Sequence, residues 1–254
     1  MDSLKKVGIS TLATEIEWPC TLQQSTKAQL LAMLKPIEIR QLDSGLPGII
    51  YVHSGCVVSY ASSVTLDNSL GLLYGAGSWF GIQVIHNNRY SPQVMYESLR
   101  PTQLFLLPTA EIERSLLKNI EIYKLLFFIS QRIGRLSLQM GSNALHSLTS
   151  RIIYVLLELS AKNLESDVSS LTIKITQQKL SQIVGVSRPR LNEVLQSLVV
   201  SGDLSLERGI IKINNPDKLK SKLHEFNLMF NDPTESDFAT SQQNDCDNKN
   251  HQCR

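Results

Sequence analysis

TQQKLSQIVGVSRPRLNEVLQSLVV, residues 176–200, predicts two short helices joined by a turn. Thr176 is a suitable N-cap, and Gly185 supplies the positive φ with which a chain leaves a helix. Val186 is expected to pack the turn, and Ser187 to cap the second helix. Apolar residues recur at helical spacing on both helices: Leu180, Ile183 and Val184 on the first, and Leu191, Val194, Leu195 and Leu198 on the second. This order is typical of a helix-turn-helix.

The first turn of the second helix carries Arg188 and Arg190. A helix-turn-helix places the N-terminal turn of its second helix in the major groove of DNA. The guanidinium fork of arginine matches the two acceptors on the edge of guanine. We therefore expect both arginines to read bases. The recognition segment comprises Ser187, Arg188, Pro189, Arg190, Asn192 and Glu193.

A β-hairpin is predicted directly after these helices. Apolar runs at 204–206 and 210–213 flank the turn residues Glu207, Arg208 and Gly209, a pattern typical of a hairpin. A β-hairpin after a helix-turn-helix is typical of a winged helix. The alternative, two packed helices with two surface arginines, would not be followed by a β-hairpin. With a helix over 150–162, a strand over 171–175 and a final helix from Pro216 to Leu223, the sequence predicts a winged helix-turn-helix domain over residues 150–224.

The distribution of charge supports a nucleic-acid partner for this domain. The whole chain has a net charge of only +2, but between Ser150 and His224 eleven bases stand against seven acids, which leaves +4. From residue 225 onward six acids outweigh two bases, which leaves −4 and masks the basic domain. A basic module beside a non-basic remainder is typical of phosphate binding. The polar tail, residues 225–254, is expected to be disordered.

The N-terminal half has the pattern of a small β-roll. Short apolar runs at 49–53, 57–61, 70–74, 93–96 and 104–107 are separated by glycines and a proline, and a helix is expected near 27–34. Many short strands at such spacing predict a barrel or roll. We expect an α+β protein whose residues 1–118 form a sensor domain.

A long helix is predicted after Pro108. Its apolar residues are spaced alternately four and three apart, as in a heptad seam: Ile122, Leu126, Ile129, Ile133, Leu136 and Met140. The seam could pack on the roll of its own chain or pair with its twin in a homodimer. We favour the dimer, because a helix-turn-helix protein usually reads two half-sites about 34 Å apart. Residues 119–149 are therefore interpreted as a dimerisation helix.

The overall composition excludes several other classes of protein. The 254 residues have a mean hydropathy of −0.06 and no apolar run that could cross a bilayer or serve as a secretory signal. Cys20, Cys56, Cys246 and Cys253 are scattered and form no CxxC pair, which suits a reducing cytoplasm. No GxSxG, P-loop or HExxH motif occurs. We expect a cytoplasmic protein that is not an enzyme and does not associate with membranes.

Two parts of the sequence resemble the Crp/Fnr family of transcription regulators. The run ITQQKLSQIVGVSRPRLNEVLQSL is similar to the family's helix-turn-helix. The segments IIYVHSGCV and GSWFG resemble the glycine-punctuated turns of its cyclic-nucleotide-binding-like β-roll. The resemblance covers roughly residues 37–223. It implies a homodimer that binds double-stranded DNA at a near-palindromic site and recruits or blocks RNA polymerase.

The resemblance also implies roles for single residues. By matching positions, Thr176, Gln178 and Ser187 would contact phosphates and Arg188 would read a base. Arg208 in the wing would add a further phosphate contact.

The recognition helix departs from the family pattern at two positions. Pro189 stands where the family commonly has a glutamate that accepts from cytosine, and Glu193 stands at the second basic, base-reading position. Arg190 is expected to take over part of the base recognition. The operator sequence therefore cannot be inferred from those of relatives.

The effector is not expected to be cyclic AMP. The family's pocket uses Gly-Glu after an aromatic residue and, one strand later, Arg-Ser. Here Phe80-Gly81 is followed by Ile82-Gln83, and the later position reads Tyr90-Ser91-Pro92 with Arg89 displaced. A buried phosphate without its guanidinium partner is poorly compensated. The roll is therefore expected to sense an unidentified small molecule, or none.

No cofactor or metal is expected either. Cys20 and Cys56 cannot supply the four ligands of an iron–sulfur cluster. Haem could use His53, His86 or Cys56, but lone histidines are more often satisfied core or surface residues. Cys246, His251 and Cys253 could together hold a soft metal, although incidental composition of the tail explains them as well. The alternative function is a ligand-binding or protein-interaction module whose winged domain contacts a partner protein rather than DNA.

Overall fold

The computed structural model describes residues 15–42, 45–63, 66–82, 94–162, 171–223 and 232–233. The N-terminal part contains α2 (Gln24–Met33), β1 (Lys35–Ile37), η1 (Ile39–Leu42), β2 (Gly48–Ser54), β3 (Cys56–Ser63), β4 (Leu66–Gly75), β5 (Trp79–Phe80), β6 (Val94–Ser98), β7 (Gln103–Pro108) and α3 (Thr109–Leu116). The long helix α4 (Glu121–Leu145) follows. The C-terminal part contains α5 (Leu148–Ala161), β8 (Leu171–Lys174), α6 (Gln177–Val184), α7 (Arg188–Val200), β9 (Leu204–Glu207), β10 (Ile210–Ile213) and α8 (Pro216–Ser221).

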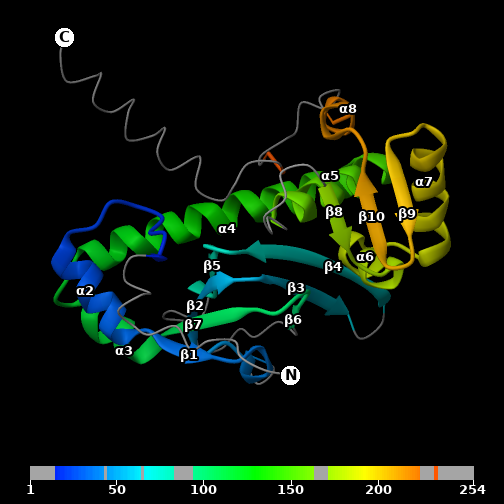
Figure 1. Cartoon of the computed structure of the whole chain (residues 1–254). Coiled ribbons are helices and arrows are strands. Elements are labelled where there is room, and N and C mark those ends of the chain that lie inside the picture. Colours follow the sequence, from blue (N-terminus) through cyan, green and yellow to red (C-terminus); the bar gives the residue numbers. More distant parts are fainter. Residues whose placement is uncertain are drawn as a thin grey trace, which may run out of the picture.

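The N-terminal strands form a β-roll of two antiparallel sheets, with strand orders β1-β7-β2-β5 and β4-β3-β6. Figure 1 shows α4 running along the roll, from α2 and α3 at one end to the winged domain at the other. The predicted roll and the α+β class are confirmed. Two strands were not predicted, β1 and β5, because runs of three and two residues carry no readable period.

Strand β2 is buried on both faces. Ile49 and Tyr51 pack against the helices α2, α3 and α4, whereas Ile50 and Val52 pack between the two sheets. Successive side chains of a strand point to opposite faces, so a strand covered on both sides reads as an unbroken apolar run. Because helices cover one face of β2 and the second sheet covers the other, apolar and polar residues do not alternate along this strand.

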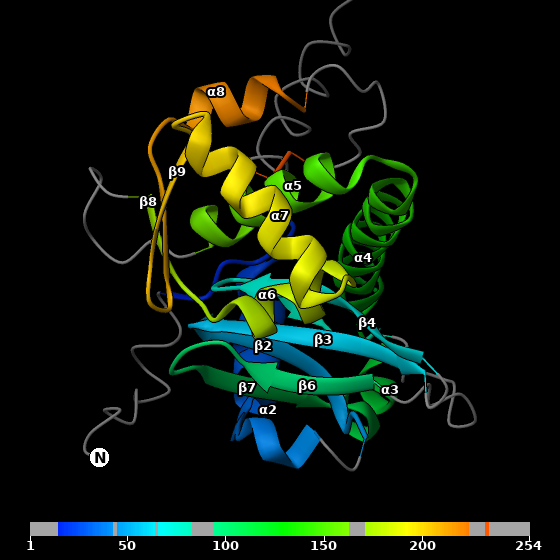
Figure 2. The same ribbon diagram turned by 90° about the vertical axis from the view of Figure 1, so that its right-hand side faces the viewer.

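The second sheet is covered by the winged domain. Val57 of β3 packs inside the roll, but Val58 and Tyr60 join the core of the winged domain. Helix α6 lies directly on this sheet, as Figure 2 shows. A Cβ at Gly71 of β4 would lie only 2.8 Å from Cγ2 of Val58 and 3.2 Å from Cα of Ile183. A glycine at this position therefore permits the close approach, and the two domains share one apolar core.

The prediction that the heptad residues of α4 face a second subunit is wrong for most of them. Ile122, Leu126 and Ile129 are buried against the roll of their own chain, and Leu136 is buried in a second cluster to which both sheets contribute. The other two seam residues are partly buried, Ile133 against the same core and Met140 near α5. A periodic stripe shows that one helix face is apolar but not what covers it.

The opposite face of α4 is also apolar, and it is exposed. Five large side chains lie on it or at its N-terminal end: Ile120, Tyr123, Phe127, Leu138 and Leu145. At 100° per residue these positions fall within about 60° around the helix axis. Gly134 and Gly141 lie on the same stripe, and a Cβ at either would meet no atom within 4 Å. The long helix thus has one apolar face packed on the roll and a second one open.

Within the described residues, no helix is long and apolar enough to cross a membrane. The predicted strand over 93–96 is seen as β6 from Val94, and Gln93 lies outside the described residues. The tail interpreted as disordered also lies outside them, apart from residues 232–233.

Candidate nucleic-acid interface

The turn between α6 and α7 has the predicted local structure. Thr176 Oγ1 accepts a hydrogen bond from the backbone N–H of Lys179 at 3.2 Å, which caps α6. Gly185 has a φ of 74°, in the left-handed region. The carbonyl oxygen of Ser181 accepts hydrogen bonds from the N–H groups of Gly185 and Val186 at 2.9 and 3.0 Å. The predicted cap and turn are therefore confirmed.

Buried leucines hold α7 in place. Leu191 and Leu195 have no exposed surface and Leu198 is nearly buried, while Val194 is half-buried against the same core. Leu180, Ile183 and Val184 of α6 are buried in the same core as predicted. The predicted inward stripes of both helices are thus confirmed.

Ser187 occupies the N-cap position of α7, but its side chain makes no capping hydrogen bond. The expectation that its hydroxyl caps the helix is therefore wrong. Pro189 lies in the first turn of α7, where the missing N–H costs no intrahelical hydrogen bond.

The recognition segment lies on the outer surface of the molecule. Its side chains are all exposed: Ser187, Arg188, Pro189, Arg190, Asn192 and Glu193. Helix α7 forms one edge of the molecule in Figure 1 and faces the viewer in Figure 2. Gln177 Nε2 donates to Asn192 Oδ1 at 3.4 Å, which links the starts of the two helices. Both guanidinium groups are thus available to a duplex.

The wing stands beside these helices as a three-stranded sheet with the order β8-β10-β9. Glu207 pairs with Ile210, and Gly209 between them has a φ of 75°. Arg208 is exposed at the tip of this turn. Thr176 and Gln178, at the start of α6, are exposed as well. The predicted phosphate contacts thus lie on the start of α6, the start of α7 and the wing.

Asp203 ties the end of α7, the wing and α8 together, a role the sequence did not reveal. Its carboxylate is solvent-inaccessible and lies 2.7 Å from Lys218 Nζ and 2.5 Å from Lys222 Nζ, and it accepts a hydrogen bond from Ser201 Oγ. Burial alone would raise the pKa of Asp203, but the hydrogen bonds from these three residues outweigh it and hold the pKa well below its usual range. The partners lie 15 and 19 residues further on, beyond the reach of local patterns.

The histidine and cysteine candidates form no metal site within the described residues, where no group of three or more His, Cys, Asp or Glu is placed to hold an ion. His53 lies 3.3 Å from the carboxylate of Glu15 and edge-on to Phe105. Cys20 is partly exposed, and Cys56 is buried. His86, Cys246, His251 and Cys253 lie outside the described residues, as do Gln83, Arg89, Tyr90, Ser91 and Pro92.

Residues 150–222 match the model of the Crp-like helix-turn-helix domain. The chain thus carries a Crp-like helix-turn-helix domain. This match supports DNA binding by the winged domain. The match favours DNA over a partner protein as the ligand of the winged domain. No curated protein sequence matches the chain.

Solved structures of low sequence identity share the fold of this chain. A protein from Eubacterium rectale, described as a transcriptional regulator of the Crp/Fnr family, is similar with a TM-score of 0.63 and 17% identity, over 80% of this chain and 95% of that one. The c-di-GMP responsive global regulator CLP of Xanthomonas campestris has a TM-score of 0.61 and 20% identity, over 76% and 100%. A transcriptional regulator from Thermus thermophilus, described as a member of the Crp/Fnr family, has a TM-score of 0.50 and 24% identity, over 75% and 93%.

Proposed function

We propose that this regulator binds a near-palindromic operator as a homodimer and that Arg188 and Arg190 read base edges in each half-site. The observation that carries the proposal is that both arginines are exposed on the first turn of α7 while the leucines behind them are buried. A helix fixed by its core and presenting two guanidinium forks suits bidentate contacts to guanine. The exposed carboxylate of Glu193 on the same helix disfavours phosphate nearby.

The phosphate contacts are proposed for Thr176, Gln178, Ser187 and Arg208. The Thr176 hydroxyl already accepts a hydrogen bond from the Lys179 N–H, so its hydrogen is left to donate to a phosphate oxygen. The Ser187 hydroxyl is not used as a cap and can do the same. The N-terminal ends of α6 and α7 add the favourable end of two helix dipoles. Together with Arg208 these groups would fix the orientation of α7 in the groove.

The homodimer is proposed to form through the open apolar face of α4. Tyr123 and Phe127 are half-exposed on it, at 50% and 57%, and Leu145 is 81% exposed. Several large apolar side chains exposed on one face of a helix indicate an interaction site. A second copy is the occupant that the function requires, because two recognition helices must be presented together. Gly134 and Gly141 would let the two helices approach closely along the rest of the stripe.

Each segment of the chain would then have its own role. Residues 1–118 would form the sensor, 119–149 the dimerisation helix and 150–224 the DNA-binding domain. RNA polymerase is the partner that a promoter-bound regulator of this type would recruit or block, and an unidentified small molecule is the effector.

Selection of bound duplexes from a random pool, with purified full-length protein, tests the proposal. We expect an inverted repeat whose half-sites are about one helical turn apart, and an affinity that falls steeply as salt is raised. The double variant R188A/R190A is the matched control and should enrich no motif. Enrichment of a single, non-repeated site by the wild type would contradict the homodimer, and no enrichment at all would contradict the operator.

A further inference from the structure

A cavity of about 640 Å³ lies between the β-roll and the winged domain. The roll contributes the start of β3 and the turn from β6 to β7. The winged domain contributes the end of α5, strand β8, the start of α6 and Gly209 of the wing turn. A volume of this size is within the range of small-molecule sites. The roles proposed above for bases, phosphates and the dimer leave this space free, although Thr176, a proposed phosphate contact, lies on its wall.

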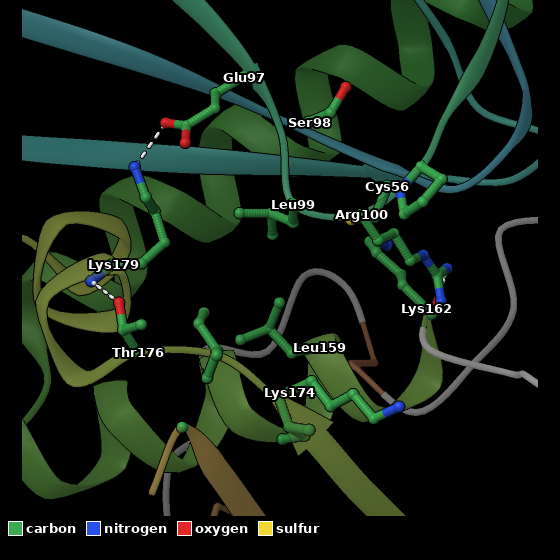
Figure 3. Close-up of a pocket in the computed structure, with 14 residues that line it drawn as sticks. Cys56, Glu97, Ser98, Leu99, Arg100, Leu159, Lys162, Lys174, Thr176 and Lys179 are labelled. Atoms are coloured by element: carbon green, nitrogen blue, oxygen red, sulfur yellow. Dashed lines mark hydrogen bonds and ion pairs between the residues drawn. The ribbon is translucent and has the colours of Figure 1, made fainter. Parts of the chain in front are cut away.

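The charge around the cavity is predominantly positive. Four cations and one carboxylate line it: Arg100, Lys162, Lys174, Lys179 and Glu97. Figure 3 shows Arg100 and Lys162 together at one side, Lys174 below them with its ammonium end directed to that side, and the ion pair of Lys179 with Glu97 at the opposite side.

The positive side of the cavity is only partly neutralised. Lys162 is paired with Glu158 behind it, at 3.4 Å, and Arg100 donates to the carbonyl oxygens of Gly55 and Lys162. Lys174 is exposed and forms no ion pair with any described residue. Its ammonium group therefore adds a positive charge that no carboxylate of the described chain offsets.

The space between the two charged sides is apolar. Leu99 and Leu159 point into it from the two domains, as Figure 3 shows, and Ile173 and Ile175 complete the walls. The Cys56 thiol also lines the cavity, and burial raises its pKa to about 11. This cysteine is therefore protonated at neutral pH and is not a nucleophile toward an occupant.

We propose that the cavity binds a small molecule with an apolar body and an anionic group, a phosphate or a carboxylate, which lies against Lys174, Arg100 and Lys162. An apolar pocket with a few convergent charged groups is the usual composition of a ligand site. The anion would gain charge-assisted hydrogen bonds from side chains of both domains.

The occupant would contact the elements that present the DNA-binding residues. Thr176 and Lys179 belong to the start of α6, and Gly209 is adjacent to Arg208 in the wing. A ligand held between roll and wing favours the relative placement that closes around it, and only such a difference in affinity shifts a population. This coupling to DNA rests on the proposed function.

Calorimetric titration of the full-length protein with phenyl phosphate, phenylacetate and benzyl alcohol tests the site. We expect at least one anion to bind more tightly than the neutral alcohol, and the tighter one identifies the anionic group. Lys174→Gln should weaken binding of that anion about three- to fivefold, as for a partly solvated ion pair, and leave benzyl alcohol unaffected. Lys212→Gln, on the neighbouring strand and outside the cavity lining, is the matched control.

The proposal is overturned if neither anion binds more tightly than the alcohol, or if both variants lose the same affinity. Affinity for the selected duplex is measured separately, with and without saturating anion. The anion should change the duplex affinity of the wild type but not that of Lys174→Gln. A protein that binds the duplex but no anion contradicts the cavity proposal alone. A protein that binds the anion but no duplex contradicts the operator proposal alone.

Discussion

The Nζ atom of Lys179 lies 2.5 Å from Oε2 of Glu97, so an ion pair joins the first helix of the helix-turn-helix to strand β6 of the roll. The same ammonium group lies 5.3 Å from the centroid of the Tyr60 ring. These polar contacts border the apolar core that the two domains share, and they join the winged domain to the β-roll within one chain.

A double-mutant cycle of Lys179→Gln and Glu97→Gln measures how much this ion pair contributes. We expect a coupling energy of about 0.2–1 kcal/mol at low salt, because the two side chains are 25% and 47% exposed and water screens their charges. Urea unfolding of the four proteins supplies the values. A coupling that does not decrease in high salt would be at odds with a screened surface pair.

Ile129→Ala tests the corrected assignment of the α4 seam. Ile129 has no exposed surface and packs against the roll of its own chain, so we expect the free energy of unfolding to fall by about 2–5 kcal/mol. Ser130→Ala, at the exposed neighbouring position, is the control and should change little. If Ile129→Ala unfolds at the same urea concentration as the wild type, Ile129 does not pack in the core of its own chain, and the original assignment to the subunit interface would be favoured.

Phe127→Glu tests the open face of α4. A carboxylate in the centre of an apolar subunit interface would be desolvated without a partner, so we expect monomers where the wild type is dimeric. Sedimentation equilibrium gives the mass of each species. Val200→Glu also replaces an exposed apolar side chain, at 89% exposure, but on α7, and should leave the dimer intact. Dissociation by both variants, or by neither, would contradict the assignment of this face.

Asp203→Asn tests the charged link at the base of the wing. We expect it to lower the free energy of unfolding by about 1–2 kcal/mol near neutral pH, because two charge-assisted hydrogen bonds are lost while solvent screens the half-exposed lysines.

The effect of this variant depends on pH. The pKa of Asp203 in the folded protein is below its ordinary value of 3.8, so its contribution is present above that value and is lost as pH falls through the folded pKa. Urea unfolding at several pH values should therefore show a constant difference between wild type and variant above about pH 5 and a shrinking one below about pH 4. A difference that grows on acidification would contradict the assignment.

Local patterns were sufficient to predict the helix-turn-helix. The Thr176 cap, the left-handed Gly185 and the apolar stripes of α6 and α7 are all properties of a few consecutive residues, and each is seen in the structure. The wing followed from the same kind of signal, two apolar runs around Gly209.

Tertiary contacts between distant elements could not be predicted in the same way. The heptad spacing of Ile122, Leu126 and Ile129 is identical whether the helix faces a roll or a twin, and only the fold shows that the roll covers it. The cavity between the domains is drawn from residues as distant as Arg100 and Lys174, which no spacing rule connects. The link from Asp203 to Lys218 and Lys222 likewise depends on tertiary structure.

The base preference of Arg188→Ala is the most direct measurement of how this regulator reads DNA. Affinities of wild type, Arg188→Ala and Arg208→Ala are compared on the selected duplex and on its single-base variants, at several salt concentrations. We expect Arg188→Ala to lose about 1–3 kcal/mol and to tolerate substitution at one base pair of each half-site. Arg208→Ala should lose affinity equally on all duplexes, with a shallower salt dependence. Full affinity and unchanged base preference in Arg188→Ala would contradict the account.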